Sequence, residues 1–204
     1  GLSLAWSCAV ELATRIGELD TALAAARSVL DLVPLEDEEG KVRAHFALVE
    51  LLREAGDLDG AVVQLERVLR DYPIHSHALE LLAELHMARG DWQTATRILY
   101  QLVPLAPNSP QRAERLYRLG EAVLVHLGDI DRADDVFLRA SDLDPSHVPT
   151  LRRLLDVYWR ADDPGALVEV ASELAERNAL ATGPTAEGSL AHAFVAAALI
   201  GDTA

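Results

Sequence analysis

The sequence predicts an all-α protein, a solenoid of stacked antiparallel helix pairs, and two observations lead to this fold class. The first is a spacing of glycine, alanine and proline in which alanine follows glycine by 5 residues and proline follows alanine by 12. The spacing occurs at Gly17, Ala22 and Pro34; Gly56, Ala61 and Pro73; Gly90, Ala95 and Pro107; and Gly128, Ala133 and Pro145. The second is a helical pattern of apolar residues on both sides of each glycine. Repeats of about 20 to 50 residues are typical of solenoids.

Each glycine lies between two segments with the apolar stripe of an amphipathic helix. From Leu58 onward, apolar residues fall at offsets 0, 3, 4, 7, 10 and 11, and from His45 to Leu52 the offsets are 0, 3, 4 and 7. These offsets lie on one helix face. We therefore expect the glycine to end the first helix in the left-handed conformation. The alanine keeps side-chain bulk low where the two helices cross. The proline ends the second helix or begins the linker, because it lacks an N–H.

These residues resemble the tetratricopeptide repeat family, in the multi-repeat form found in bacteria. The family unit of about 34 residues carries Leu-Gly, Gly, Ala, an aromatic residue, Ala and Pro at fixed positions. The fourth copy matches with Leu119, Gly120, Gly128, Ala133, Phe137, Ala140 and Pro145. The resemblance implies a right-handed superhelix of about 11 helices that forms a single solenoid. Its expected repeats span residues 3–36, 42–75, 76–109, 112–147 and 148–180, followed by a half-repeat at 186–204.

The fourth and fifth copies depart from the family pattern. The fourth has one extra residue between Gly120 and Gly128, and the fifth has Ala161-Asp162 in place of Gly-Asp. We expect the second helix of the fifth copy to begin with Asp163 as its N-cap and Pro164 in its first turn.

The sixth copy stops at its inter-helix turn, Gly201-Asp202. Its helix either caps the solenoid or continues into further repeats. Caps normally have a polar outer face, whereas residues 191–200 are apolar nearly all round. We therefore expect a fragment of a longer chain.

Composition limits the classes of partner. The formal net charge of −15 disfavours nucleic acid and anionic membrane surfaces. No apolar run has the length of a membrane span and no signal peptide is recognisable, so we expect no membrane insertion. Residue 1 is glycine rather than methionine, which suggests a processed or engineered fragment. The compartment is left open, with a weak preference for the cytoplasm.

The sequence offers no convincing catalytic, cofactor or metal site. It has no glycine-rich phosphate loop, and no pair of carboxylates stands out as catalytic. His75 and His77 are two residues apart, whereas a helical metal site prefers a spacing of three or four. We interpret the histidines as polar surface residues, except His45 and His86, which occupy core repeat positions. Cys8, the only cysteine, has no activating neighbour in sequence. We expect a non-enzymatic protein without cofactor or metal.

One column of acidic residues indicates a binding surface. In the family, the first helices of the repeats line the concave face, and five of their positions contact bound peptides. One of these positions, the ninth, holds Glu11, Glu50, Glu84, Glu121 and Asp156. Phe46 and Tyr117 at the fifth position and Trp159 at the twelfth add apolar surface. The resemblance therefore implies a peptide-binding groove, and its acids favour a basic segment.

The same acids also fit a solvated face that is neutralised by Arg15, Arg53 and Arg160 about one turn away. The column further depends on counting positions from the Leu-Gly or Leu-Leu pair. Counting back from the turn would move Glu121 and Asp156 off it.

The resemblance implies a non-catalytic scaffold that binds a peptide or protein segment in its concave groove. Fold alone does not give function, so two other roles stay open. One is a structural spacer that self-associates through the apolar last helix, which contains Phe194 and Ile200. The other is an accessory domain of a larger enzyme.

Overall fold

A computed structural model describes residues 19–34, 36–161 and 163–179, and within these ranges the regular elements are helices with no strand. The all-α prediction is therefore confirmed. The chain divides into two compact units, Gly1–Asp91 (unit 1) and Trp92–Ala204 (unit 2), and each is described by itself. The expected first helix around Glu11, the turn at Gly17 and the half-repeat at 186–204 lie outside the described residues.

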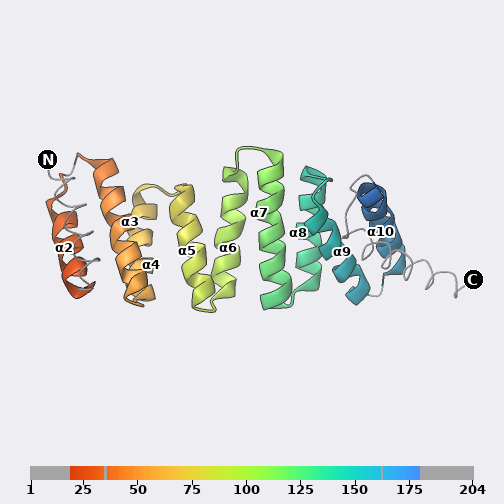
Figure 1. The fold of residues 1–204 in the computed structure, drawn as a ribbon, viewed down its shortest axis with the longest axis horizontal. Coiled ribbons are helices and arrows are strands. Elements are labelled where there is room, and N and C mark those ends of the chain that lie inside the picture. The colour runs from red at the N-terminus through yellow and green to blue at the C-terminus, as the bar shows by residue number, and fades with distance from the viewer. Residues whose placement is uncertain (1–18, 35, 162, 180–204) are drawn as a thin grey trace, which may run out of the picture. The chain divides into compact units, whose positions relative to one another are not determined.

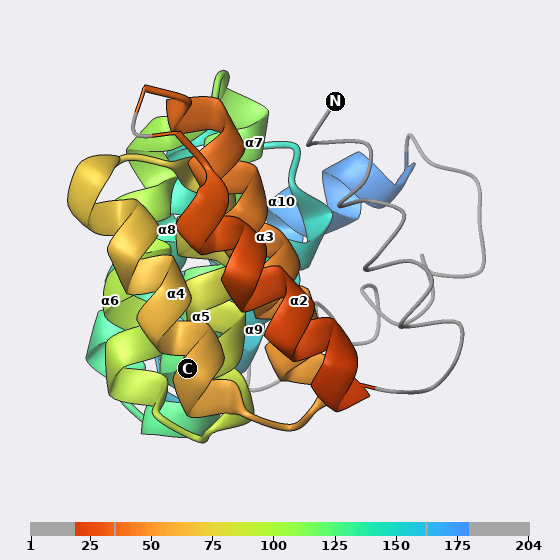
Figure 2. The same ribbon diagram turned by 90° about the vertical axis from the view of Figure 1, so that its left-hand side faces the viewer.

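Unit 1 contains four described helices: α2 (Leu19–Leu32), α3 (Glu38–Glu54), α4 (Leu58–Asp71) and α5 (Ser76–Ala88). Each helix packs against the next one along the chain. Figures 1 and 2 show these helices side by side, with short connections that reverse the chain direction between neighbours. This is the expected arrangement of antiparallel pairs.

Unit 2 follows the same plan. It contains α6 (Trp92–Leu102), a 3₁₀ turn η1 (Val103–Leu105), α7 (Ser109–Ala122), a π-helical turn η2 (Val123–Leu127), α8 (Ile130–Leu143), α9 (Val148–Ala161) and α10 (Pro164–Ala179). The pairs α6 and α7, α7 and α8, α8 and α9, and α9 and α10 are in contact.

The glycine turns form as the sequence predicts. Gly56 and Gly90 have φ of 75° and Gly128 has φ of 66°, in the left-handed region that favours glycine. The aspartate after the glycine then caps the next helix in two of these turns. Asp57 accepts a hydrogen bond from the backbone N–H of Gly60 at 2.8 Å, and Asp129 accepts one from Arg132 at 3.1 Å. Such caps satisfy N–H groups that a helix start leaves without partners.

Prolines follow the ends of several helices, and a capping aspartate precedes α10. The helices α2, α4 and α8 each end two residues before the proline of their set. In the third set α6 ends earlier, at Leu102, and continues as a 3₁₀ turn that contains Pro104, so Pro107 lies in the linker. The predicted start of α10 is confirmed, since Asp163 accepts a hydrogen bond from the N–H of Ala166 at 3.1 Å.

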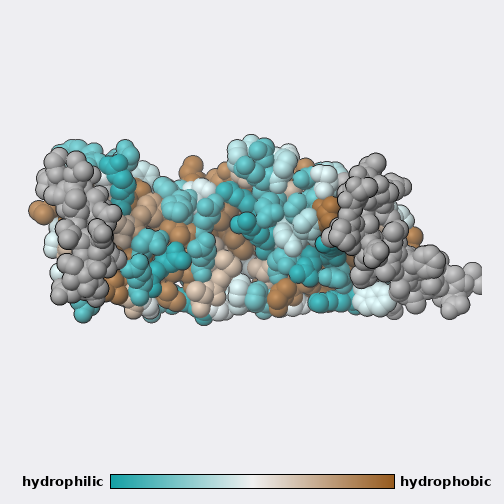
Figure 3. Space-filling view, in the orientation of Figure 1, coloured by the Kyte–Doolittle hydropathy of each residue, from teal (hydrophilic) through white to brown (hydrophobic). Residues whose placement is uncertain are grey.

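The recurrent alanines of the repeats are buried. Ala22, Ala61, Ala95 and Ala133 are all 0% exposed. Hydrophobic and hydrophilic side chains are interspersed on the face of the chain drawn in Figure 3. Burial of the small and aliphatic residues between the helices is the main favourable contribution to the folding of such repeats.

Gly120 is a second point of close approach. A Cβ atom built on Gly120 would lie 2.5 Å from Cε1 of Phe137, which is itself fully buried. The extra residue between Gly120 and Gly128 coincides with the π-helical turn η2, which is wider than an α-helical turn. The turn accommodates the insertion after Gly120, so α7 retains its packing on α8 up to that point.

A half-buried pair of titratable groups joins α8 to α9. The Tyr158 hydroxyl donates a hydrogen bond to the carboxylate of Asp134. Burial, followed by the negative charge of Asp134, raises the pKa of Tyr158 to about 12. Burial likewise raises the pKa of Asp134 above its ordinary value.

We predict that Gly120→Ala destabilises the protein by about 1–3 kcal/mol, because the added methyl group overlaps the ring of Phe137. Urea unfolding measures the loss. Gly165→Ala is the matched control, since its Cβ would meet only Asp163 at 3.5 Å, an ordinary contact. Equal stability of the two variants would refute the close-packing role of Gly120.

We also predict that Tyr158 ionises near pH 12 in the folded chain. Because its folded pKa is raised, the stability that neutral Tyr158 contributes is complete below about pH 10 and is lost as the pH rises through 12. Phenolate absorbance is titrated in wild type and in Tyr158→Phe, and the ionisation that the variant lacks is that of Tyr158. If that ionisation lies near pH 10 instead of pH 12, the contact with Asp134 does not raise the pKa of Tyr158.

Candidate functional site

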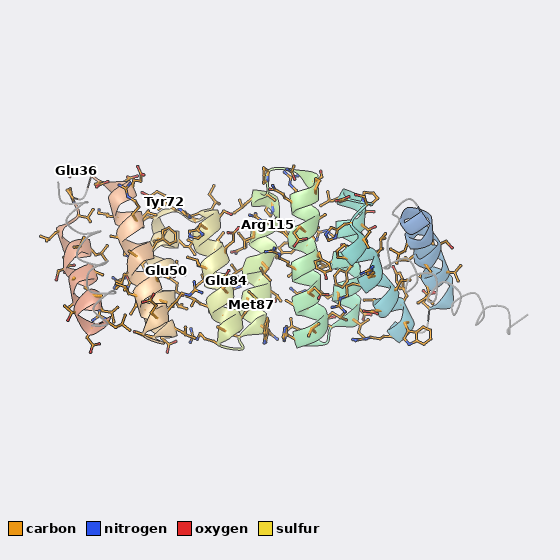
Figure 4. The ribbon with its side chains drawn as sticks, in the orientation of Figure 1. Glu36, Glu50, Tyr72, Glu84, Met87 and Arg115 are labelled. Atoms are coloured by element: carbon orange, nitrogen blue, oxygen red, sulfur yellow. The ribbon has the colours of Figure 1, made fainter. Side chains whose placement is uncertain are left out.

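The predicted site residues lie on the first helices of the repeats. In unit 1, Phe46 and Glu50 are on α3 and Glu84 is on α5, the two latter labelled in Figure 4. In unit 2, Tyr117 and Glu121 are on α7, and Asp156 and Trp159 are on α9. We call these two areas the unit 1 surface (α3 and α5) and the unit 2 surface (α7 and α9). Glu11 lies outside the described residues.

On the unit 1 surface, Arg53 lies between the two acids. Its Nη1 is 3.5 Å from Oε1 of Glu50, and its Nη2 is 3.8 Å from Oε2 of Glu84. The side chains of Glu50 and Glu84 are 59% and 56% exposed. Long ion pairs between exposed groups contribute only about 0–1 kcal/mol each. Both carboxylates therefore remain accessible to another cation.

On the unit 2 surface, Arg153 holds the acids much more tightly. Its Nε is 2.5 Å from Oε1 of Glu121 and its Nη2 is 2.8 Å from Oε2, a forked arrangement. Its Nη1 donates to Asp156 at 3.0 Å. The bond to Glu121 raises the pKa of Arg153, since it stabilises the charged guanidinium. Glu121 is 27% exposed and Asp156 is 49% exposed, so Glu121 is the more enclosed of the two acids that Arg153 contacts.

The arginines that neutralise the acids are therefore only partly those expected from sequence. Arg53 takes the predicted role, Arg15 lies outside the described residues, and Arg153 rather than Arg160 pairs with Asp156. The missed signal was the spacing of three residues between Arg153 and Asp156, which places them on the same helix face. The contact of Arg153 with Glu121 joins residues 32 apart in sequence, and no local pattern indicates it.

The three aromatic candidates differ in accessibility. The ring of Phe46 packs against His75 and His77, with centroids 5.3 and 4.9 Å away. The ring of Tyr117 packs against Phe137 and His147 and is half-buried. Trp159 is 56% exposed and is the one candidate among them with most of its surface open to a partner.

A hydrogen-bonded chain that sequence reasoning missed connects α7 to the start of α9. Nδ1 of His147 is 2.7 Å from Oγ1 of Thr150, and its Nε2 is 3.2 Å from Oε2 of Glu114. The order of hydroxyl, imidazole and carboxylate is that of a catalytic triad. Thr150 is 0% exposed, however, so no substrate reaches its hydroxyl. The chain therefore fastens the beginning of α9 to α7.

Three further histidines in the described ranges also have structural partners. His75 accepts a hydrogen bond from the N–H of Ala78 and caps α5, which corrects its interpretation as a plain surface residue. His45 contacts Gln64 at 3.1 Å, and burial lowers its pKa. His86 pairs with Asp91 at 3.1 Å. In the described part of the chain, no group of three or more potential ligands is arranged to hold a metal ion.

Two further expectations concern the membrane and self-association. Among the described helices, none is both long enough and apolar enough to cross a bilayer. The expected self-association surface at Phe194 and Ile200 lies outside the described residues.

The fold and the turn chemistry define a helical-repeat protein made of antiparallel helix pairs. A family model described as tetratricopeptide repeat matches residues 52–119. Residues 52–119 thus carry the tetratricopeptide repeat that the sequence pattern predicts. The bacterial origin and the repeat boundaries stay predictions.

Solved structures share this fold. A MamA structure titled "MamA RS-1 ArsTM double mutant" is 20% identical with a TM-score of 0.60, covering 90% of this chain and 98% of that one. MamA from Desulfovibrio magneticus RS-1 is 20% identical with a TM-score of 0.58 over the same shares. YrrB, titled a TPR protein with an unusual peptide-binding site, is 18% identical with a TM-score of 0.54 and 82% of each chain covered. No curated protein matches the chain. The solenoid fold class is thereby confirmed, and at these identities the likeness concerns the fold alone.

We predict that the two arginines differ in their contribution to stability. Arg153→Met should cost about 1–3 kcal/mol, because it leaves the half-buried Glu121 without its charged partner. Arg53→Met should cost about 0–1 kcal/mol, since its ion pairs are long and exposed. Urea unfolding of both variants at low salt checks the difference, and a loss for Arg53→Met as large as that for Arg153→Met would contradict it.

Proposed function

We propose that the chain is a non-catalytic scaffold that binds a protein segment on the first-helix surfaces of its repeats. Tetratricopeptide repeats as a family support a protein-interaction role, and the match at residues 52–119 covers α4, α5 and α6 in full. The burial of Thr150 argues against catalysis by its triad-like arrangement with His147 and Glu114. We therefore expect binding rather than chemistry.

The observation that carries the finer proposal is the pair of exposed acids on the unit 1 surface. Glu50 and Glu84 come from successive first helices and share only the long contacts to Arg53. An arginine or lysine of a partner can approach either carboxylate at closer range than Arg53 does. A basic segment laid across α3 and α5 is thus the class of ligand that this surface fits best.

The unit 2 surface plays a different part in the proposal. Arg153 already pairs with Glu121 and Asp156 at 2.5 and 3.0 Å, so a basic partner would compete with it. Trp159 is exposed on the same helix as Asp156 and offers an apolar anchor instead. Micromolar affinity needs about 8 kcal/mol, which exposed charge pairs alone do not supply. A segment bound on either surface therefore needs apolar contacts as well as charge pairs.

We predict that Glu50→Gln with Glu84→Gln weakens the binding of basic segments by about two- to thirtyfold, from the loss of two charge pairs. The probe is a set of short peptides in which arginine alternates with leucine, measured against the full chain at low salt by fluorescence anisotropy.

The matched control is Glu66→Gln with Asp71→Asn, which removes the same charge at exposed positions of α4, outside the unit 1 surface. Equal weakening by both pairs would reveal a nonspecific effect of net charge. Unchanged binding by the variant with Glu50→Gln and Glu84→Gln would exclude the unit 1 surface as the site.

A further inference from the structure

Three rings gather at one end of the unit 1 surface, and we call them the ring platform: Phe46, His75 and His77. The centroid of the Phe46 ring lies 5.3 Å from that of His75 and 4.9 Å from that of His77, at interplanar angles of 49° and 40°. Phe46 and His75 are half-buried, and His77 is exposed. Because the His75 ring accepts the capping hydrogen bond from Ala78, its orientation is fixed by the start of α5. The platform is thus a preformed area of ring surface that solvent reaches in part.

The ring platform and the acids of the unit 1 surface lie along the same two helix faces. On α3, Glu50 and Arg53 follow Phe46 by 4 and 7 residues, and on α5, Glu84 follows His77 by 7. Residues at these spacings share one face of a helix. Phe46 contacts His77, and Arg53 contacts Glu84 at 3.8 Å. Both contacts join residues 31 apart in sequence, so the two faces meet in one register, which we call the seam.

The seam becomes acidic beyond the ring platform. After Phe46, the charged residues of α3 are Glu50, Arg53 and Glu54. Apart from histidine, those of α5 are Glu80 and Glu84. Figure 4 labels Glu50 and Glu84 on their two helices. Four carboxylates therefore accompany one guanidinium, and this excess of negative charge attracts a cation. A site for an apolar ring and a site for a cation consequently adjoin each other along the seam.

The separation of the two sites sets the geometry of a ligand. Since an α-helix rises 1.5 Å per residue, Glu50 lies about 6 Å beyond Phe46 along α3. An extended chain advances about 3.3 Å per residue and directs every second side chain to the same side. Two residues of such a chain span about 6.6 Å, which matches the separation. Adjacent residues of an extended chain point to opposite sides and do not reach both sites.

We propose that the unit 1 surface recognises an extended segment in which an aromatic residue and an arginine flank a single residue, in either order. The aromatic ring packs on the ring platform, and the arginine pairs with Glu50 or Glu84. Aromatic rings in tilted contact stabilise a complex beyond the burial of their area. The platform thus supplies the apolar contact that charge pairs need in addition. This inference rests on the proposed function, since it assumes that basic segments bind to this surface.

The test compares two peptides of identical composition on the full chain at low salt. In the first peptide, phenylalanine and arginine flank one serine, and in the second they are adjacent, with serine and glycine elsewhere. Both peptides carry the same charge, so a difference in affinity reports spacing alone. Fluorescence anisotropy should show that the first peptide binds about three- to tenfold more tightly, from the contact of its ring with the platform.

Two variants connect this preference to the ring platform. His77→Ser removes an exposed ring from the platform and should reduce the preference to less than about twofold. Val63→Ser is the matched control, since it removes an exposed apolar side chain from α4, outside the seam, and should leave the preference unchanged. Equal loss of preference in the two variants would overturn the role of the platform.

The outcomes separate this inference from the proposed function. Suppose that wild type binds both peptides equally and that Glu50→Gln with Glu84→Gln weakens both. The spacing rule is then overturned, and the proposed function stands. If neither peptide binds, or if binding is insensitive to that pair of substitutions, the proposed function is overturned together with the inference.

Discussion

The close approach of the two helices in each pair is the constraint on which the rest of the structure depends. Ala61 on α4 and Ala133 on α8 are 0% exposed, and these helices contact α3 and α7, respectively. Bulkier residues there would push the helices apart, because protein interiors have little free volume. Gly120 shows the same constraint in its strictest form against the ring of Phe137. The crossings fix the first helices in each unit and thereby decide which acidic side chains come within reach of one arginine.

Two surfaces built from the same repeat position have consequently acquired different electrostatic properties. The guanidinium nitrogens of Arg53 lie 3.5 and 3.8 Å from the carboxylate oxygens of its two acids. Those of Arg153 lie 2.5 to 3.0 Å from the carboxylate oxygens of Glu121 and Asp156. An acid held by a forked, half-buried guanidinium is part of the fold. An acid that remains exposed beside a distant arginine is available to a partner. A column of acids in a sequence is thus no measure of the charge that a ligand would meet.

The sequence predicted the features that depend on neighbouring residues, and missed those that depend on helix-to-helix contact. The left-handed Gly56, Gly90 and Gly128 and the Asp163 cap follow from local chain geometry, so spacing alone reveals them. The extra residue before Gly128 could be counted, but the sequence did not show that a π-helical turn would accommodate it. The pairing of Arg153 with Glu121 and of His147 with Glu114 joins residues more than 30 apart. Such pairs require knowledge of which helices are neighbours.

The central claim is that the unit 1 surface on α3 and α5 binds a basic protein segment. The most direct measurement is to titrate the isotopically labelled chain with an arginine-containing peptide and follow the backbone amide resonances by NMR. The account predicts that the largest shifts cluster around Glu50 and Glu84, with small shifts along the exposed face of α4. Shifts confined to α4, or spread evenly over the chain, would contradict it.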